Sequence, residues 1–191
     1  MEINELEQWV YSEKELESLL GSDEYLDLIS LTYKQQSSLY EAEKILRPHI
    51  NIGKYYDWSL RRVLQKVIEH STDVHKYIEQ CYDMYCDGYG FLDNLGLGYG
   101  LVTTVPPSEY GADSWEKLES SEQKKLIEGF YPSVREEAEK VISWLDTGKI
   151  IITGHKGGFQ GIQYTDSRTP KEKEPTGYNV ATPTKKWWKL W

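Results

Sequence analysis

The residues best suited to chemistry lie in the stretch Cys81–Val105, which reads CYDMYCDGYGFLDNLGLGYGLVTTV. The three alternate glycines within Gly96–Gly100 invite comparison with a phosphate-binding loop, but such a loop needs a strand before it and a helix after it. Here the pattern predicts a helix before the glycines and a strand after them. Asp87 and Asp93 would also repel a phosphate. We therefore expect tight turns beneath packed aromatic rings at these glycines.

A second set of polar residues, His75, Glu79 and Asp83, is spaced four apart and so shares one face of a predicted helix. One histidine with two carboxylates is a set that binds a hard or intermediate metal or performs acid–base chemistry. If such a site exists, Asp87 and Asp93 should converge on it. This gives one hypothesis, a metal-assisted or acid–base hydrolase or transferase with its pocket between the 73–86 helix and the glycine-rich 88–100 loop. The alternative interpretation is an ordinary solvated helix face.

The cysteines and histidines do not form a known motif. His70, His75, Cys81 and Cys86 have the composition of a zinc site but not its spacing. The sequence contains no nucleophile motif of the hydrolase families and no His-Glu-x-x-His. We therefore predict no metal and no cofactor, and we expect free thiols in a cytoplasmic protein.

The net charge of −9 points toward protein partners. An acidic surface repels nucleic-acid backbones and steers association toward basic molecules. Tyrosine and tryptophan, which are abundant here, are favoured at interfaces. This profile is similar in composition to inhibitor or immunity-type proteins that mask a basic toxin.

The main hypothesis is therefore an acidic protein-binding module, without catalytic activity, that engages a basic protein. Its acidic groups would steer the encounter and its tyrosine rings would supply the contact area. The residues predicted to form this surface are Tyr82, Asp83, Tyr85, Asp87, Tyr89 and Asp93.

Two amphipathic helices are expected to position these residues. The first carries an apolar stripe at helical spacing, formed by Leu60, Val63, Leu64, Val67 and Ile68. The second repeats the spacing from Val74 through Tyr85, and the short turn between them predicts an antiparallel helical hairpin. The segment Phe91–Val105 is expected to be irregular or extended, with a strand at Leu101–Val105. Near the N-terminus, periodicity leaves the run Leu26–Tyr33 open between helix and strand.

A β-hairpin is expected near the C-terminus, because Lys149–His155 and Phe159–Thr165 flank a Gly-Gly pair. The predicted fold class is α+β, mainly α, a helical bundle with a small antiparallel hairpin. The chain length favours one domain, over residues 1–165. Residues 166–191 are predicted to form a charged, loosely held connector and a basic, tryptophan-rich tail.

The tail ends in KKWWKLW, which pairs lysines with rings in the manner of a membrane-surface segment. The acidic body disfavours membrane binding, and no stretch has the apolar length needed to span a bilayer. Docking on the acidic body is favoured instead, because burying a tryptophan contributes on the order of 2–3 kcal/mol. We expect at least one of Trp187, Trp188 and Trp191 to be packed, with a lysine among Lys185, Lys186 and Lys189 near carboxylates.

Overall fold

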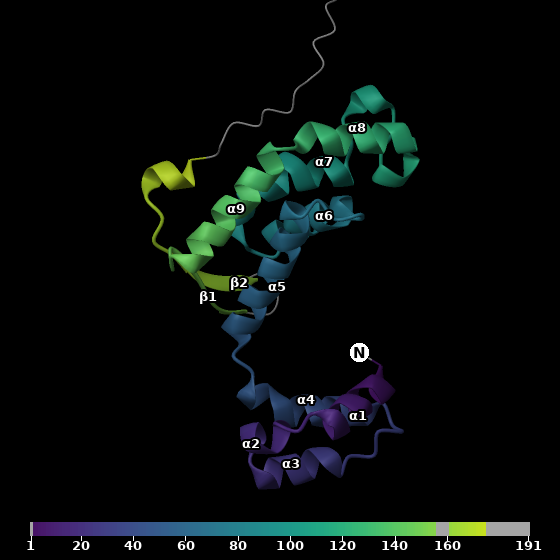
Figure 1. The fold of residues 1–191 in the computed structure, drawn as a ribbon, viewed down its shortest axis with the longest axis vertical. Coiled ribbons are helices and arrows are strands. Elements are labelled where there is room, and N and C mark those ends of the chain that lie inside the picture. The colour runs from purple at the N-terminus through teal and green to yellow at the C-terminus, as the bar shows by residue number, and fades with distance from the viewer. Residues whose placement is uncertain (1, 156–160, 175–191) are drawn as a thin grey trace, which may run out of the picture. The chain divides into compact units, whose positions relative to one another are not determined.

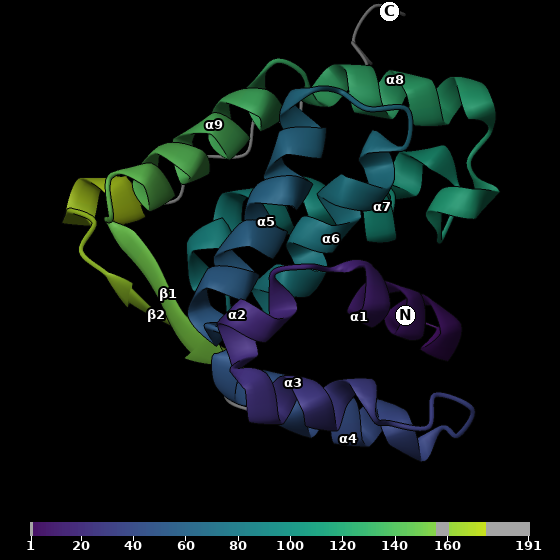
Figure 2. The ribbon, with the colours of Figure 1, turned by 60° about the horizontal axis from the view of Figure 1, so that its bottom comes forward.

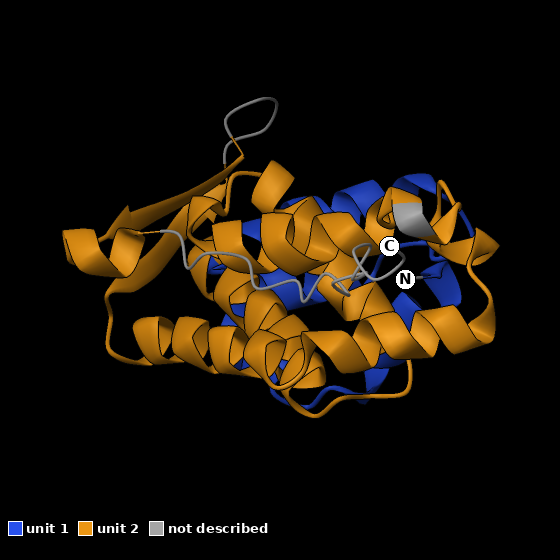
Figure 3. Ribbon diagram, turned by 90° about the horizontal axis from the view of Figure 1, so that it is seen from above, with its two compact units in different colours: residues 1–51 blue, residues 52–191 orange. Residues whose placement is uncertain are grey.

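The computed structural model describes residues 2–155 and 161–174. Contacts divide the chain into two compact units, residues 1–51 and 52–191, which Figure 3 shows in different colours. Each unit has a hydrophobic core of its own. The expectation of a single domain over residues 1–165 concerns whether the two units fold together, and it stays a prediction.

Unit 1 is built from short helices: α1 (Ile3–Ser12), α2 (Leu16–Leu20), α3 (Ser22–Ile29), α4 (Ser37–Leu46) and a 3₁₀ turn at Arg47–His49. Of the segment left open between helix and strand, residues 26–29 form the last part of α3, and residues 30–33 lie in turns and bends outside any helix or strand. The left-handed conformation of Gly21, with φ of 86°, separates α2 from α3. Leucines from α1, α2 and α3 form most of its small core, and Tyr33 closes it by donating its hydroxyl to the carbonyl of Leu28 at 2.8 Å.

Unit 2 begins with the predicted helical hairpin, α5 (Ile52–Ile68) and α6 (Val74–Cys86). The stripe expected on α5 is confirmed, since Leu60, Val63, Leu64 and Val67 are all buried. Helix α9 (Ser133–Asp146) packs against α5, and α8 (Ser120–Phe130) precedes it (Figure 1). In the described part of this unit, 3₁₀ turns lie at Gly90–Leu92, Ser108–Tyr110, Trp115–Lys117 and Pro170–Lys173.

The prediction of a strand at Leu101–Val105 is wrong. Residues Asn94–Gly100 form a π-helical segment that continues directly into the short helix α7 (Leu101–Thr104). A Cβ added at Gly96 would lie 2.7 Å from the Cβ of Tyr85 on α6. The absence of a side chain at Gly96 therefore allows the π-helical segment to pack closely against α6. The glycines do not form the tight turns we expected.

The predicted β-hairpin is confirmed as an antiparallel pair, β1 (Ile150–His155) and β2 (Ile162–Asp166). Its register pairs Ile150 with Asp166 and shifts at a bulge between Ile152 and Gly154. Strand β1 packs along α5, and Figure 2 shows the two strands side by side at one edge of unit 2.

As far as residue 174, the chain after the β-hairpin makes several local contacts, and the loose connector expected there stays a prediction. A 3₁₀ turn at Pro170–Lys173 is capped by Thr169, whose side chain accepts a hydrogen bond from the Glu172 N–H. The Lys149 ammonium lies 2.5 Å from the Glu172 carboxylate and helps to lower the pKa of Glu172 to about 2. The Arg168 guanidinium lies 4.4 Å from the centre of the Trp144 ring. The tail tryptophans and lysines, with the docking predicted for them, lie outside the described residues.

These elements confirm the predicted fold class, a mainly α protein of the α+β class with a small antiparallel sheet near the C-terminus. Within the described part of the chain, none of the helices has the length and apolar character that crossing a membrane requires.

Candidate interaction surface

The six residues predicted to bind a partner lie on α6 and on the chain that follows it. Tyr82, Asp83 and Tyr85 belong to the last turns of α6, while Asp87, Tyr89 and Asp93 lie between its end and the π-helical segment. The structure does not give all six the same surroundings, and it exposes mainly the carboxylates of Asp83 and Asp87.

Tyr82 and Tyr85 are half-buried because their inner sides meet the π-helical segment. A Cβ added at Gly100 would lie 2.7 Å from the Cβ of Tyr82, and the same is true of Gly96 and Tyr85. Part of each tyrosine is thus committed to packing within unit 2, and only the remainder can contact a partner.

Tyr89 and Asp93 serve the fold locally. Tyr89 is 2% exposed, its ring contacts Phe91, and burial raises the pKa of its hydroxyl. Asp93 is half-buried, and its carboxylate accepts a hydrogen bond from the Asn94 N–H at 2.9 Å at the start of the π-helical segment. A partner docked on this face would therefore meet Asp83 and Asp87 before it met Tyr89.

The residues of the enzymatic hypothesis do not form a metal site. Within residues 2–155 and 161–174, no three histidine, cysteine or acidic side chains are placed to hold a metal ion. His75 instead stacks on Trp115, with ring centres 4.8 Å apart and 12° between the ring planes. The two elements expected to enclose the pocket of that hypothesis contact each other closely at Gly96 and Gly100, and the pocket itself stays a prediction.

Neither cysteine supports the zinc alternative. Cys81 is fully buried on the core side of α6, where burial raises the pKa of its thiol to about 12, and Cys86 is exposed. The Cys81 thiol donates to the carbonyl oxygen of Tyr77 at 3.3 Å. Cys81 therefore behaves as a small apolar core residue, in keeping with its place on the helical stripe.

His75 should make the stability of unit 2 sensitive to mild acid. Burial, with a smaller contribution from Lys76, lowers the pKa of His75 below its ordinary value of 6.5. The unfolded chain therefore binds more protons than the folded chain below about pH 6.5. The contribution of neutral His75 to the stability of unit 2 should be complete above pH 6.5. It should decline as the pH falls toward the folded pKa of His75.

The test is an NMR titration of the His75 ring in the intact chain, together with urea unfolding at pH 7.5 and pH 5.5. We expect a titration midpoint below 6.5, and a smaller loss of stability in acid for His75→Phe, which keeps a ring against Trp115. A midpoint at or above 6.5 would contradict the effect.

The structure also forms an aromatic surface that the sequence analysis missed, exposed at Tyr55 and Trp58 and half-buried at Tyr56 and His155. It runs from Trp58 through Tyr55 and Tyr56 to His155, and we call these four residues the aromatic strip. Tyr55 lies 5.3 Å from Tyr56 and 6.1 Å from Trp58, measured between ring centres. His155 stacks on Tyr56 at 5.2 Å, and its Nε2 lies 3.3 Å from the Asp87 carboxylate. The strip thus joins the predicted acidic surface at Asp87.

Three close backbone contacts place the strip. Gly53 on α5 lies against the carbonyl group of Ile152 on β1, which brings His155 beside Tyr56. The main-chain carbonyl of Asp87 accepts a hydrogen bond from the Ile162 N–H at 2.8 Å, where Gly161 and α6 approach each other. The end of α6, the start of α5 and the end of β1 therefore meet at a single edge of unit 2.

One sequence signal could have pointed to part of this surface. Tyr55 and Trp58 stand outside the apolar stripe of α5, and each is 52% exposed. Large aromatic rings on the solvent-facing side of an amphipathic helix are candidates for interface residues. The contribution of His155 had no comparable signal, because it depends on the pairing of β1 with α5.

Comparisons of the chain with protein-family models, with curated proteins and with solved structures found no match. The functional argument therefore depends on the surface itself.

Proposed function

We propose that the protein is an acidic binding module that masks a basic protein partner, in the manner of an inhibitor or immunity-type protein. The observation that carries this proposal is the continuity of the aromatic strip with the carboxylate of Asp87. Exposed tryptophan and tyrosine beside an acidic group form the combination that dominates binding energy at many interfaces.

The exposure of the strip supports this role. Tyr55 and Trp58 lie on two successive turns at the start of α5, and each leaves 52% of its surface in water. Burying rings of this size on association would supply apolar contact area at a low cost in side-chain entropy. Mutual ring contacts already restrict Tyr55, Tyr56 and Trp58, so little further ordering is needed on binding.

The charge of the chain supports a basic partner. The net charge of −9 attracts basic molecules from a distance, and Asp87 provides a local carboxylate whose side chain is 49% exposed. Charges of this kind mainly raise the rate of association and select the partner, whereas the rings hold the complex. The division of roles agrees with the sequence hypothesis, although most of the rings now come from α5 instead of α6.

Replacing Trp58 by alanine should weaken partner binding at least tenfold. Truncating a hot-spot residue to alanine typically costs about 2 kcal/mol or more of binding free energy. The full chain is first used to capture its partner from the cells that express it. The affinity of each variant for the purified partner is then measured at low and moderate salt. Trp58 is exposed, so the variant should fold normally, which circular dichroism would verify.

A matched control is Tyr40→Ala in unit 1, since Tyr40 is also an exposed ring, at 68%, but lies outside the strip. The control should bind as the unmodified chain does, within about twofold, in line with energetically neutral surface positions. Equal binding by the Trp58 variant, or a captured partner that is acidic, would overturn the proposal.

A further inference from the structure

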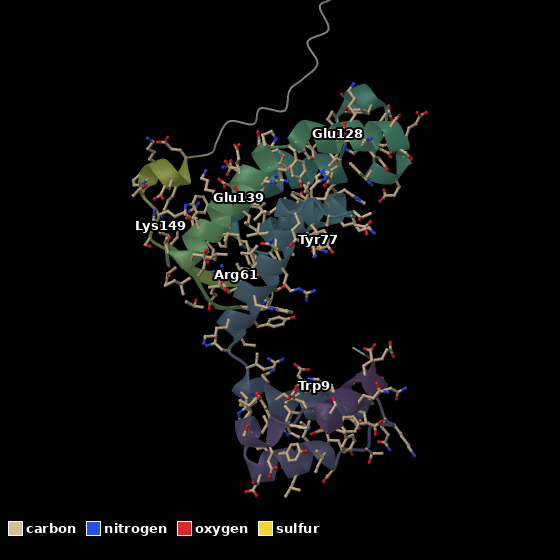
Figure 4. The ribbon with its side chains drawn as sticks, in the orientation of Figure 1. Trp9, Arg61, Tyr77, Glu128, Glu139 and Lys149 are labelled. Carbon is tan, nitrogen blue, oxygen red and sulfur yellow. The ribbon has the colours of Figure 1, made fainter. Side chains whose placement is uncertain are left out.

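A groove runs between α5 and α6 beside the aromatic strip. Its lining residues are Ser59, Arg62, Val63, Lys66, Tyr77 and Gln80, and its volume is about 230 Å³. The α5 members are spaced three or four apart, so they share one side of that helix. Tyr77, labelled on α6 in Figure 4, and Gln80 form the facing wall.

The polar groups of this groove share one chemical character. Arg62 and Lys66 carry positive charge, while the side chains of Gln80, Ser59 and Tyr77 can each donate a hydrogen bond. None of the lining residues that the structure describes is acidic, although the chain as a whole is strongly acidic. The groove of unit 1 lined by Glu24, Asp27 and Glu41 has the opposite sign. The α5–α6 groove is thus a local exception to the charge of the protein.

Each of the two cations already makes one contact within the protein. The Arg62 guanidinium lies 4.8 Å from the centre of the Trp58 ring, and among the described residues no carboxylate pairs with it. The Lys66 ammonium lies 3.2 Å from the Glu69 carboxylate, one turn along the same helix. A guanidinium over a ring face can still donate from its N–H groups to a planar anion.

The size of the groove limits what it can hold. Sites that enclose whole small molecules usually have volumes of roughly 300–1,000 Å³, so this groove suits a single side chain. Val63, which is 7% exposed, gives the groove an apolar floor suited to a short aliphatic stem. A carboxylate on such a stem, as in glutamate or aspartate, fits both the charge and the floor.

We propose that the α5–α6 groove binds the carboxylate side chain of an acidic peptide segment, with Arg62 and Lys66 as its cationic contacts. Gln80 donates a further hydrogen bond from α6, and the aromatic strip lies next to the segment through the Arg62–Trp58 contact. This inference goes beyond the proposed function, because it does not require the partner to be basic overall.

The test is an NMR titration of the intact chain with N-acetyl-glutamate methylamide, and with the glutamine counterpart as the neutral probe. We expect saturable shifts of the Arg62 Nε–Hε and Gln80 side-chain amide signals with the glutamate probe. Binding of the glutamine probe should be at least tenfold weaker. Equal shifts with both probes, or no saturable shift with the glutamate probe, would overturn the proposal.

Variants and a second anion complete the experiment. Arg62→Gln combined with Lys66→Gln should abolish the shifts, whereas Lys124→Gln, which removes an exposed cation of α8, should leave them unchanged. Inorganic phosphate distinguishes the two sources of negative charge. Saturable binding of phosphate without binding of the glutamate probe would show a phosphate site and would overturn peptide docking.

Discussion

Replacing Gly100 by alanine is expected to destabilise unit 2 by about 2–3 kcal/mol, the upper part of the range for overpacked cores. The added Cβ would lie 2.7 Å from the carbonyl oxygen of Ile78 and 2.9 Å from the backbone nitrogen of Tyr82. These are backbone atoms of α6, so they cannot turn aside as a flexible side chain would. The helix-forming advantage of alanine over glycine, about 1 kcal/mol, is too small to offset the clash.

Urea unfolding followed by circular dichroism measures this effect. The matched control is Gly129→Ala in α8, where an added Cβ meets no heavy atom within 4 Å. The control should stabilise the protein by roughly 0.5–1 kcal/mol, because alanine lowers the entropy cost of the helix. If both variants gained stability alike, the close packing of the π-helical segment on α6 would be wrong.

Replacing Gly53 by alanine should have a similar cost, about 2–3 kcal/mol, and should also disturb the aromatic strip. The new Cβ would overlap the carbonyl oxygen of Ile152 and lie 3.1 Å from the carbonyl carbon of Thr153. Strand β1 would have to move away from α5, and His155 would lose its stacking on Tyr56. The variant should therefore lose both stability and binding through the strip.

Unfolding experiments and NMR shifts of the Tyr56 and His155 rings test this together. Gly154→Ala in β1 is the control, since nothing lies within 4 Å of its added Cβ. It should change the free energy of unfolding by less than about 0.5 kcal/mol, as a surface substitution normally does. A Gly53 variant whose ring shifts match those of the unmodified chain would show that β1 does not depend on this close contact.

Local sequence patterns by themselves determined the helical hairpin, through its periodicity, and the C-terminal β-hairpin, through its Gly-Gly pair. The stripe from Leu60 to Val67 is amphipathic at helical spacing, and burial of that face is what holds α5 against the core. Similarly, isoleucine-rich segments around a Gly-Gly pair have few alternatives to pairing with each other. These elements follow from interactions between residues close in sequence, so local patterns suffice to predict them.

The segment Asn94–Gly100 shows where local patterns fail. Glycines favour turns and disfavour helices, so the sequence predicted an irregular chain there. In the structure the spacing of Gly96 and Gly100 lets the segment lie directly against the backbone of α6, and that packing compensates for poor helix propensity. The compensating contact comes from another helix, so no local rule contains it.

The candidate surface divides in the same way. The sequence determined that acidic and aromatic residues are abundant, and it placed Asp83 and Asp87 near the end of α6. Only the tertiary structure decided that Tyr89 is buried and that Tyr56, Asp87 and His155, from three distant segments, meet at one edge. Burial and proximity depend on which elements pack together, because close approaches such as those of Gly53 and Gly161 are set by the backbone path of the whole unit.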